Sequence, residues 1–257
     1  MSRTLGIVQP QPHGDGLRNR FSRKLGGKSW LEWAIHRAAD SLRIDQWVVV
    51  LGDNEDSQAI AEFVPPDIPV FLGHGDPLRC FTDAMNQYAP AAVVRIAADN
   101  PFVDPVLIDR LVTSASGHEH CDYVSYCSQA GRPVIQSPLG ILAEWCRADA
   151  LRQADREATE SVDRTEVTRY LYSHPEEFHL RLIPIPQQLD RNDVRLRMDV
   201  EEDWLHTETI YEALGPDALE WQQIIELLEV QPALRQRMAH LNRTLVPAKG
   251  RLAERNA

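Results

Sequence analysis

The first half of the chain alternates short apolar runs with stretches whose apolar positions recur every three or four residues. Residues 46–52 (QWVVVLG) form a continuous apolar run, which is typical of a strand buried on both faces of a sheet. Residues 29–42 (SWLEWAIHRAADSL) carry apolar residues at spacings of four, three and four, starting from Leu31, and this pattern predicts one apolar face of a helix. We expect Ser29 to cap that helix, because its hydroxyl can accept from a free backbone N–H of the first turn.

The same alternation continues up to residue 99. Strands are predicted over residues 4–9, 68–73 and 91–97, and helices over residues 56–63 and 77–89. This order builds a mostly parallel sheet with right-handed crossovers and helices on its faces. Ligands of open α/β sheets bind beyond the carboxyl ends of the strands. We therefore expect Gln9, Gly52 with Asp53, and Asp99 to meet at one edge of the sheet.

Beyond Pro105 the pattern is less regular. Helices are predicted over residues 105–115, 147–154, 163–178, 201–214, 219–230 and 233–245, and strands over residues 121–127, 136–145, 178–185 and 194–200. We predict one domain over residues 1–246, in which residues 215–246 form a C-terminal helical appendage. Residues 247–257 form a polar tail that we expect to be disordered.

Composition narrows the class of protein. A chain of 257 residues can bury one large core, and its formal net charge of -11 argues against a partner with a phosphate backbone, so no nucleic acid is expected. No apolar run approaches the roughly 18 to 20 residues that span a bilayer, and the N-terminus lacks the apolar core of a signal peptide, so we expect a cytoplasmic protein. Four cysteines without a CxxC pair are expected to be reduced and mostly buried: Cys80, Cys121, Cys127 and Cys146.

The run VVRIAADNPFVDP takes an apolar strand directly into Asp99. Two interpretations are open: an Asp-Asn-Pro turn that ends the strand, or a metal ligand presented at the carboxyl end of the strand. The stretch HEHC at residues 118–121 could suggest zinc, but its crowded spacing favours a polar connection.

Six stretches, in order along the chain, follow the pattern of a known family: GIVQ, LGGKSWLEWAI, IDQWVVVLGDNEDSQAIAEF, VVRIAADNPFVDPVLID, DYVS and RLRMDVEEDWLHTETIYEAL. From Gly6 to Leu214 the chain resembles the cytidylyltransferases that activate acidic sugars, most closely the branch named after spore coat polysaccharide biosynthesis protein F. The resemblance implies a nucleotide-diphospho-sugar transferase (Rossmann-like) α/β fold, a three-layer α/β/α sandwich with a mostly parallel sheet. It also implies Mg²⁺-dependent transfer of CMP from CTP to a sugar, with release of pyrophosphate, in the biosynthesis of polysaccharides or cell-surface glycans.

The resemblance implies that Asp99 and Asp199 are the two metal ligands. A triphosphate brings about four negative charges and requires a divalent cation, and Mg²⁺ needs only one or two protein carboxylates. Asp199 could instead be the N-cap of a helix that begins near Glu201. Substrate contacts are assigned on the same basis to Gln9, Gly52, Asp53, Asn100, Glu144 and Arg164. For Glu144 a solvated strand position is an alternative, and Gly52 with Asp53 could form an ordinary turn.

The family's phosphate loop, R-x-G-S-T-R-L-P-x-K, corresponds here to QPHGDGLRNR. Aligned without gaps, only Arg20 replaces the lysine of the loop. A shifted register, with GDGLR as a G-x-G-x-R loop, uses Gly14, Gly16 and Arg18 and adds Lys24 as a cation. In both registers the chain has a basic cluster suited to an anion, although a solvated basic loop is an alternative. We assign catalytic roles to Arg20 and Lys24, together with Asp99.

Three further positions depart from the family. Thr165 and Glu166 replace a Glu-His pair, and Cys80 stands where many relatives have arginine. Three functions are therefore weighed: an active cytidylyltransferase, a non-catalytic nucleotide- or sugar-binding relative, and a glycosyl transferase of similar architecture, for which no D-x-D supports a metal site. The expected partners are CTP and a sugar, and no membrane; the sugar, the base and the formation of a homodimer are left open.

Overall fold

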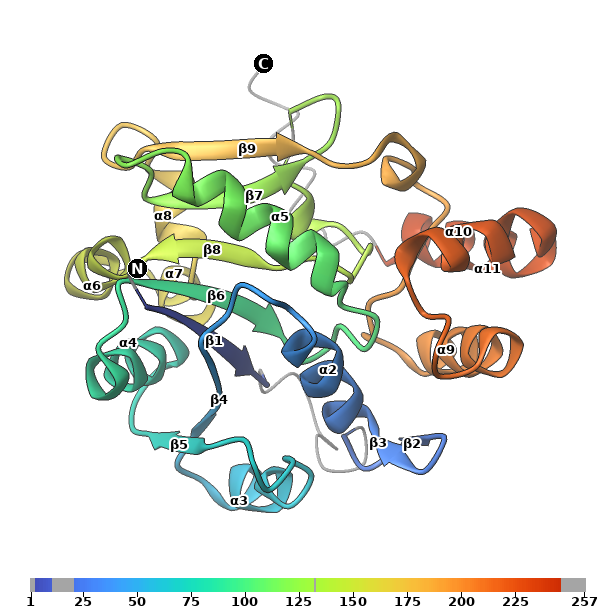
Figure 1. Cartoon of the computed structure of the whole chain (residues 1–257), viewed down its shortest axis with the longest axis horizontal. Coiled ribbons are helices and arrows are strands. Elements are labelled where there is room, and N and C mark those ends of the chain that lie inside the picture. The colour runs from blue at the N-terminus through green and yellow to red at the C-terminus, as the bar shows by residue number, and fades with distance from the viewer. Residues whose placement is uncertain (1–2, 11–20, 132, 246–257) are drawn as a thin grey trace.

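A seven-stranded sheet runs through the centre of the molecule, with helices on both faces (Figure 1). The computed structural model describes residues 3–10, 21–131 and 133–245. In spatial order the strands are β5 (Val70–Gly73), β4 (Gln46–Gly52), β1 (Thr4–Gln9), β6 (Ala92–Ala97), β8 (Glu144–Arg147), β7 (Tyr123–Cys127) and β9 (Leu180–Pro184). Only β8 runs antiparallel to its neighbours within this sheet. The predicted three-layer, mostly parallel α/β architecture is confirmed.

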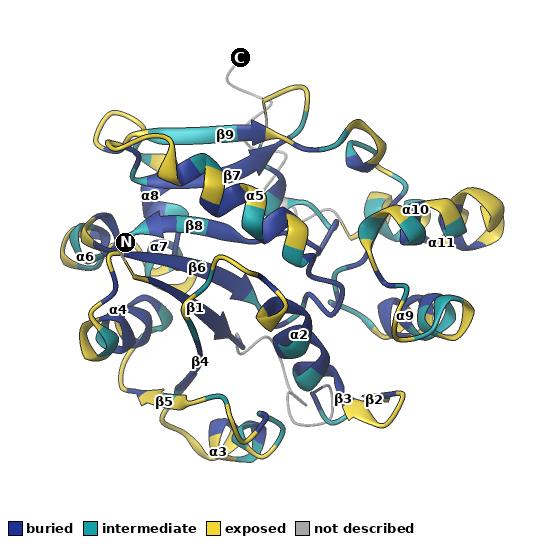
Figure 2. Ribbon diagram, in the orientation of Figure 1, coloured by how far each residue is buried: buried dark blue, intermediate teal, exposed yellow. Residues whose placement is uncertain are grey.

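Successive residues of the central strands face opposite sides of the sheet, and each side has its own hydrophobic cluster. Val8, Val49 and Val94 belong to one cluster. Ile7, Val48 and Val93 belong to the other. Both faces are covered, which is why these strands are continuous apolar runs instead of alternating ones. Figure 2 shows the centre of the sheet buried and exposure concentrated on the outer sides of the helices.

The helices divide between the two faces. The first cluster takes up residues of α2 (Trp30–Ala39), α3 (Glu55–Ala61) and α5 (Pro105–Ser116). The second takes up residues of α4 (Pro77–Tyr88), α6 (Ala148–Glu157) and α8 (Arg169–Ser173). The predicted cap of α2 is confirmed, because the hydroxyl of Ser29 accepts from Glu32 N and the carboxylate of Glu32 accepts from Ser29 N.

The C-terminal helices α9 (Glu201–Leu214), α10 (Trp221–Val230) and α11 (Pro232–Thr244) lie at one end of the sheet (Figure 1). Ile224, Leu228, Leu234 and Met238 from α10 and α11 are buried in the same cluster as α2 and α5. The predicted polar tail, residues 247–257, lies outside the described residues. No helix in the described part of the chain is long and apolar enough to cross a membrane.

Three sequence-based assignments are wrong. Residues 194–200 form no strand, and the strand predicted over 136–145 is limited to β8, preceded by a short 3-10 helix, Val134–Gln136. The helix predicted over 163–178 is two short helices, α7 (Ser161–Thr165) and α8, because the chain turns at residues 166–168. A two-stranded ribbon, β2 (Lys24–Leu25) and β3 (Lys28–Ser29), and a 3-10 helix at Gln187–Leu189 complete the elements.

Candidate active site

The carboxyl ends of β1, β4 and β6 lie side by side at one edge of the sheet, as predicted. Gln9 and Ala97 are register partners at the ends of β1 and β6, and Gly52 ends the neighbouring β4. Asp99 follows two residues after β6, in a turn closed by a bond from Asn100 N to Ala97 O (3.2 Å). This edge faces α9 (Figure 1). Asp199 directly precedes Val200, the N-cap of that helix.

A pocket of about 410 Å³ opens beside the ends of β1 and β4. Its walls include Gln9, Gly52, Asn54 and Cys80. Cys80 is a neutral wall residue, because burial raises the pKa of its thiol. Asp53 does not line the pocket; its carboxylate lies 3.3 Å from Nδ1 of the exposed His74. The predicted substrate contacts at Gln9 and Gly52 therefore adjoin a cavity, and Asp53 points elsewhere.

The side chain of Gln9 is buried and its orientation is determined by its neighbours. Nε2 donates to the carbonyl oxygen of Pro77 (3.0 Å), which only an N–H can satisfy, so the amide is assigned without ambiguity. Oε1 is buried and has no hydrogen-bond partner among the described residues. A buried acceptor without a donor is costly, and a ligand that supplies an N–H would remove this cost.

Asp99 and Asp199 converge on a third side chain, Arg197. Nε of Arg197 lies 2.7 Å from Oδ2 of Asp99 and 2.8 Å from Oδ1 of Asp199. Burial lowers the pKa of Arg197, but the charges of Asp99 and Asp199 outweigh burial and the net shift is upward. Oδ1 of Asp99 is buried and has no hydrogen-bond partner in the part of the chain that the structure describes. The two predicted ligands are thus brought together from positions 100 residues apart in the sequence.

A second arginine, Arg195, supports Asp199 from behind. Arg195 is buried, and its Nη2 lies 2.8 Å from Oδ2 of Asp199 while its Nε donates to Oδ1 of Asp203 (2.6 Å). Asp203 also accepts from the backbone N–H groups of Asp199 (2.9 Å) and Val200 (3.0 Å). The alternative in which Asp199 caps the helix is wrong, because the N-cap is Val200, whose backbone N–H donates to Asp203.

Backbone contacts fix the segment that carries these groups. Leu196 N and Arg197 N donate to Pro138 O (3.0 and 3.2 Å), and Met198 N donates to Asp99 O (3.0 Å). Gly140 has φ +65°, and a Cβ there would lie 2.4 Å from Arg197 N. Only glycine permits this close approach of two backbone segments. The position of Asp199 relative to Asp99 is therefore set by backbone packing.

The donor set fits a divalent cation. In the described residues no cluster of three or more His, Cys, Asp or Glu side chains is arranged to hold a metal ion. Mg²⁺, however, is commonly held by one or two carboxylates and its own waters. Asp99 and Asp199 present carboxylate oxygens to one point, and the unpartnered Oδ1 of Asp99 leaves a further oxygen for a ligand. Residues 118–121 form a polar connection between α5 and β7, in line with the sequence interpretation.

Other predicted site residues have structural partners. Asn100 is buried and donates to Leu142 O (3.3 Å). Glu144 is 0% exposed, so the solvated alternative is wrong; its carboxylate accepts from Arg95 Nη1 (2.7 Å), Thr168 Oγ1 (2.8 Å) and the hydroxyl of Tyr123. Substrate contact by either residue stays a prediction.

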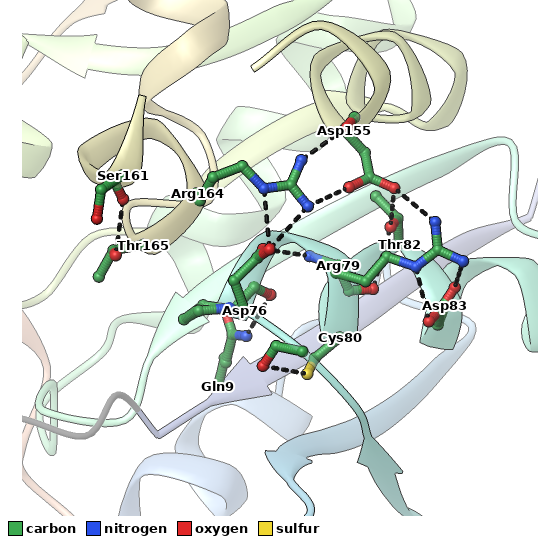
Figure 3. Close-up of polar contacts among 12 residues, drawn as sticks. Gln9, Asp76, Arg79, Cys80, Thr82, Asp83, Asp155, Ser161, Arg164 and Thr165 are labelled. Carbon is green, nitrogen blue, oxygen red and sulfur yellow. Dashed lines mark hydrogen bonds and ion pairs between the residues drawn. The ribbon is translucent and has the colours of Figure 1, made fainter. Parts of the chain in front are cut away.

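Arg164 joins three helices beside the pocket (Figure 3). Its Nε donates to Oδ2 of Asp76 (3.0 Å), and its Nη1 and Nη2 donate to the carbonyl oxygen and Oδ1 of Asp155 (2.6 and 2.7 Å). Asp76 in turn caps α4 by accepting from Arg79 N (2.9 Å). Every nitrogen of this guanidinium has a protein partner, and its predicted role in substrate binding is untested.

The predicted phosphate loop falls largely on residues outside the described part of the chain, which include Gly14, Gly16, Arg18 and Arg20. The described residues that flank it lie at the site. Pro10 lines the pocket. Arg23 donates to Glu201 (2.8 Å), two residues beyond Asp199, and lies over the ring of Trp204. Lys24 is exposed in β2. The described residues on the two sides of the predicted loop therefore lie at the pocket, for Pro10, and at the first turn of α9, for Arg23.

The fold and this edge define an α/β protein of the nucleotidyltransferase class. The MobA-like NTP transferase domain matches residues 15–173, more than half of the chain, and the chain belongs to this family. It is 30% identical over 236 residues to an uncharacterized protein of Methanocaldococcus jannaschii, covering 90% of this chain and 92% of that protein. It is 27% identical over 241 residues to spore coat polysaccharide biosynthesis protein SpsF of Bacillus subtilis, covering 90% of this chain and 96% of that protein.

A solved cytidylyltransferase of Leptospira borgpetersenii shares the fold, with a TM-score of 0.79 at 18% identity, covering 92% of this chain and 98% of that chain. The resemblance to cytidylyltransferases and to the spore coat F branch is confirmed. Sequence reasoning missed Arg195, Arg197 and Asp203. The spacing Asp199-x-x-x-Asp203 at the start of the helix was a usable signal for the contact between these two residues. No signal in the sequence indicated that the side chain of Arg197 points at Asp99 and Asp199.

Proposed function

We propose that this protein is a Mg²⁺-dependent cytidylyltransferase that transfers CMP from CTP to the hydroxyl of an acidic sugar. The oxygen of the sugar hydroxyl forms a bond to the α-phosphorus, the bond from this phosphorus to the bridging oxygen of the β-phosphate breaks, and pyrophosphate leaves. The observation that carries this proposal is the convergence of Asp99 and Asp199 on one point. Asp99 follows β6 at the same edge of the sheet at which Gln9 and Gly52 line the pocket. Membership of the cytidylyltransferase-like nucleotidyltransferases supports the same reaction class.

Asp99 and Asp199 are the residues that would hold the metal. Bound there, Mg²⁺ supplies positive charge for the phosphate oxygens as negative charge develops on them. Arg195 and Asp203 hold Asp199 in place, and Gly140 allows the backbone of Arg197 to approach closely. These groups orient the carboxylates before substrate arrives, which lowers the cost of assembling the site.

The pocket suits the nucleobase. Gln9 offers a buried acceptor, Oε1, and its donor side is already used by Pro77. Cytosine carries an exocyclic amine, a donor, where thymine and uracil carry a carbonyl oxygen, an acceptor. An acceptor whose orientation is fixed therefore favours cytosine over uracil, because a uracil carbonyl would leave two buried acceptors facing each other.

The basic stretch suits the triphosphate. Its flanks lie at the pocket, through Pro10, and at the first turn of α9, through the pair of Arg23 with Glu201. Between them the sequence carries two glycines and the arginines Arg18 and Arg20, residue types that allow close backbone approach and bidentate phosphate contacts. Lys24 follows directly. We assign these cations to the phosphates and place the product in the biosynthesis of a polysaccharide, the class that the name of the Bacillus relative states.

The test is pyrophosphate release from CTP, UTP and ATP with a panel of acidic sugars, with and without Mg²⁺. We expect turnover with CTP in the presence of Mg²⁺, and a loss of at least about 100-fold for Asp99→Asn and Asp199→Asn, by analogy with the loss of one group that stabilises developing charge. Asp149→Asn is the matched control, because Asp149 carries the same charge on the exposed face of α6.

Two results would contradict the proposal. If both aspartate variants turn over like the parent, these carboxylates do not hold the metal. If the parent shows no turnover with any sugar and no triphosphate binding by calorimetry, the protein is a non-catalytic relative on the same scaffold.

A further inference from the structure

The point where the two candidate metal ligands meet is held by a cation of the chain itself. Nε of Arg197 lies 2.7 Å from Asp99 and 2.8 Å from Asp199, and both contacts are ion pairs. Arg197 precedes Asp199 by two residues, so the ligand and the competing cation belong to the same short segment. Its side chain is 29% exposed, which leaves it a path toward solvent.

The charges of Asp99 and Asp199 are balanced by either a divalent ion or, in part, the guanidinium of Arg197, and binding both cations would leave an excess of positive charge. Arg195 makes two bonds to Asp203, and these two charges cancel. The remaining set of Asp99, Asp199 and Arg197 carries a net charge of -1. A divalent ion with the guanidinium still in place would bring this set to +1, whereas the same ion with the guanidinium withdrawn would bring it to zero. Two cations at one point also repel each other strongly in a partly buried site.

The contacts of Arg197 are suited to release. Its Nε lies within ion-pair distance of both carboxylates, yet it is buried without a hydrogen-bond partner in the part of the chain that the structure describes. Nε is therefore held by the charges of the two carboxylates, without a well-directed hydrogen bond, whose strength depends steeply on angle. The backbone beneath it is fixed by Pro138 and by the close approach of Gly140, so withdrawal needs rotation of the side chain alone.

We propose that Arg197 is a built-in competitor of the divalent cation: its guanidinium occupies the position between Asp99 and Asp199 and must withdraw before a metal binds there. This inference rests on the metal role of the two aspartates in the proposed function. Arg197 lowers the affinity of the free protein for metal and keeps the two carboxylates from repelling each other. It is a positioning residue, since it acts on the reaction through the aspartates.

The test measures Mn²⁺ binding by calorimetry and by the electron paramagnetic resonance signal of the free ion, without nucleotide or sugar. We expect Arg197→Met and Arg197→Gln to bind Mn²⁺ at least tenfold more tightly than the parent, and this gain to disappear when Asp99→Asn is added. Thermal unfolding with and without Mn²⁺ provides a second readout. Without metal, the Arg197 variants should unfold at a lower temperature than the parent. Addition of Mn²⁺ should raise their unfolding temperature by more than it raises that of the parent.

Arg191→Met is the matched control. Arg191 also lies between two carboxylates, those of Asp193 and Glu229, and is similarly part-buried. Arg235 pairs with the same two carboxylates and remains in the variant, so no new metal site is expected. Arg191→Met should bind Mn²⁺ like the parent.

The outcomes separate this inference from the proposed function. If the parent binds Mn²⁺ through Asp99 and both Arg197 variants fold and bind no more tightly, Arg197 does not compete and the inference fails while the metal site stands. If neither the parent nor a folded Arg197 variant binds Mn²⁺, with or without CTP, the metal assignment itself fails. A tightening that survives Asp99→Asn overturns the inference as well, because the ion would then lie elsewhere.

Discussion

Replacing Glu144 by glutamine should destabilise the protein strongly. The side chain of Glu144 is 0% exposed. Its ion-pair partner is Arg95, whose Nη1 lies 2.7 Å from Oε2 of Glu144 and whose side chain is 9% exposed. The other carboxylate oxygen accepts from Thr168 and from Tyr123, whose pKa is raised by burial and by the charge of Glu144, so that its hydroxyl stays a donor. All partners of this carboxylate are therefore donors.

The size of the effect follows from these partners. Glutamine keeps the volume but removes the charge, so Arg95 remains buried without a counter-ion. Its NH₂ group must also face a donor, whichever way the amide is turned. Removing one partner of a buried ion pair costs about 3–5 kcal/mol. For a chain of this size that corresponds to a melting temperature lower by roughly 6–20 °C, at about 2–4 °C per kcal/mol.

Urea unfolding followed by circular dichroism measures the free energy, and calorimetry measures the melting temperature. Asp149→Asn is the control, because Asp149 is 85% exposed and its pair with Arg152 should contribute less than about 1 kcal/mol. The double variant Arg95→Met/Glu144→Gln should recover part of the loss, since no unpaired charge remains. A loss below about 1 kcal/mol for Glu144→Gln would refute the reasoning, because that is the range of an exposed pair.

Two further predictions concern backbone conformation and pH. Gly140→Ala should lose more stability in urea unfolding than Gly131→Ala. Both glycines have positive φ, which costs about 1–2 kcal/mol for a residue with a Cβ. Of these two sites, only Gly140 would bring the new Cβ against a backbone atom, Arg197 N at 2.4 Å. Equal losses would contradict this argument. Burial lowers the pKa of His206 below 6.5 in the folded state, so the unfolded state binds the proton first, and stability should fall as pH drops below 6.5. We expect His206→Asn to reduce the slope of unfolding free energy against pH between about pH 6.5 and 5, by up to about 1.4 kcal/mol per pH unit, and an unchanged slope would contradict this assignment.

The central elements were predictable because their signals are local. The apolar run of β4 and the helical spacing of α2 with its Ser29 cap agree with the structure. The conformation of the segment 194–200 was not predictable in this way. Its apolar and charged residues alternate as in a strand, but it forms none. Its backbone bonds to the single carbonyls of Pro138 and Asp99 instead of a neighbouring strand, and alternation alone does not reveal whether a strand is available to pair with.

The candidate site shows the same division. Asp99 and Asp199 were found from their places after a strand and before a helix, together with the family resemblance. The interpretation of Glu144 as a solvated residue failed, because its three donors come from β6, β7 and the turn before α8, which no local pattern connects. Arg164 likewise has partners in α6 and just before α4.

The amino-acid sequence by itself determined which stretches between residues 4 and 97 become the main strands and helices, that the sheet is mostly parallel, and that carboxylates and an amide lie at its carboxyl edge. It did so because periodicity, capping and strand direction depend on residues close together in the chain. Only the tertiary structure decided what each polar group faces: that Arg197 lies between Asp99 and Asp199, and that Gln9 turns its acceptor away from Pro77. Those partners are chosen by the packing of distant backbone segments, as where Gly140 admits the backbone of Arg197, and such contacts leave no periodic trace in the sequence.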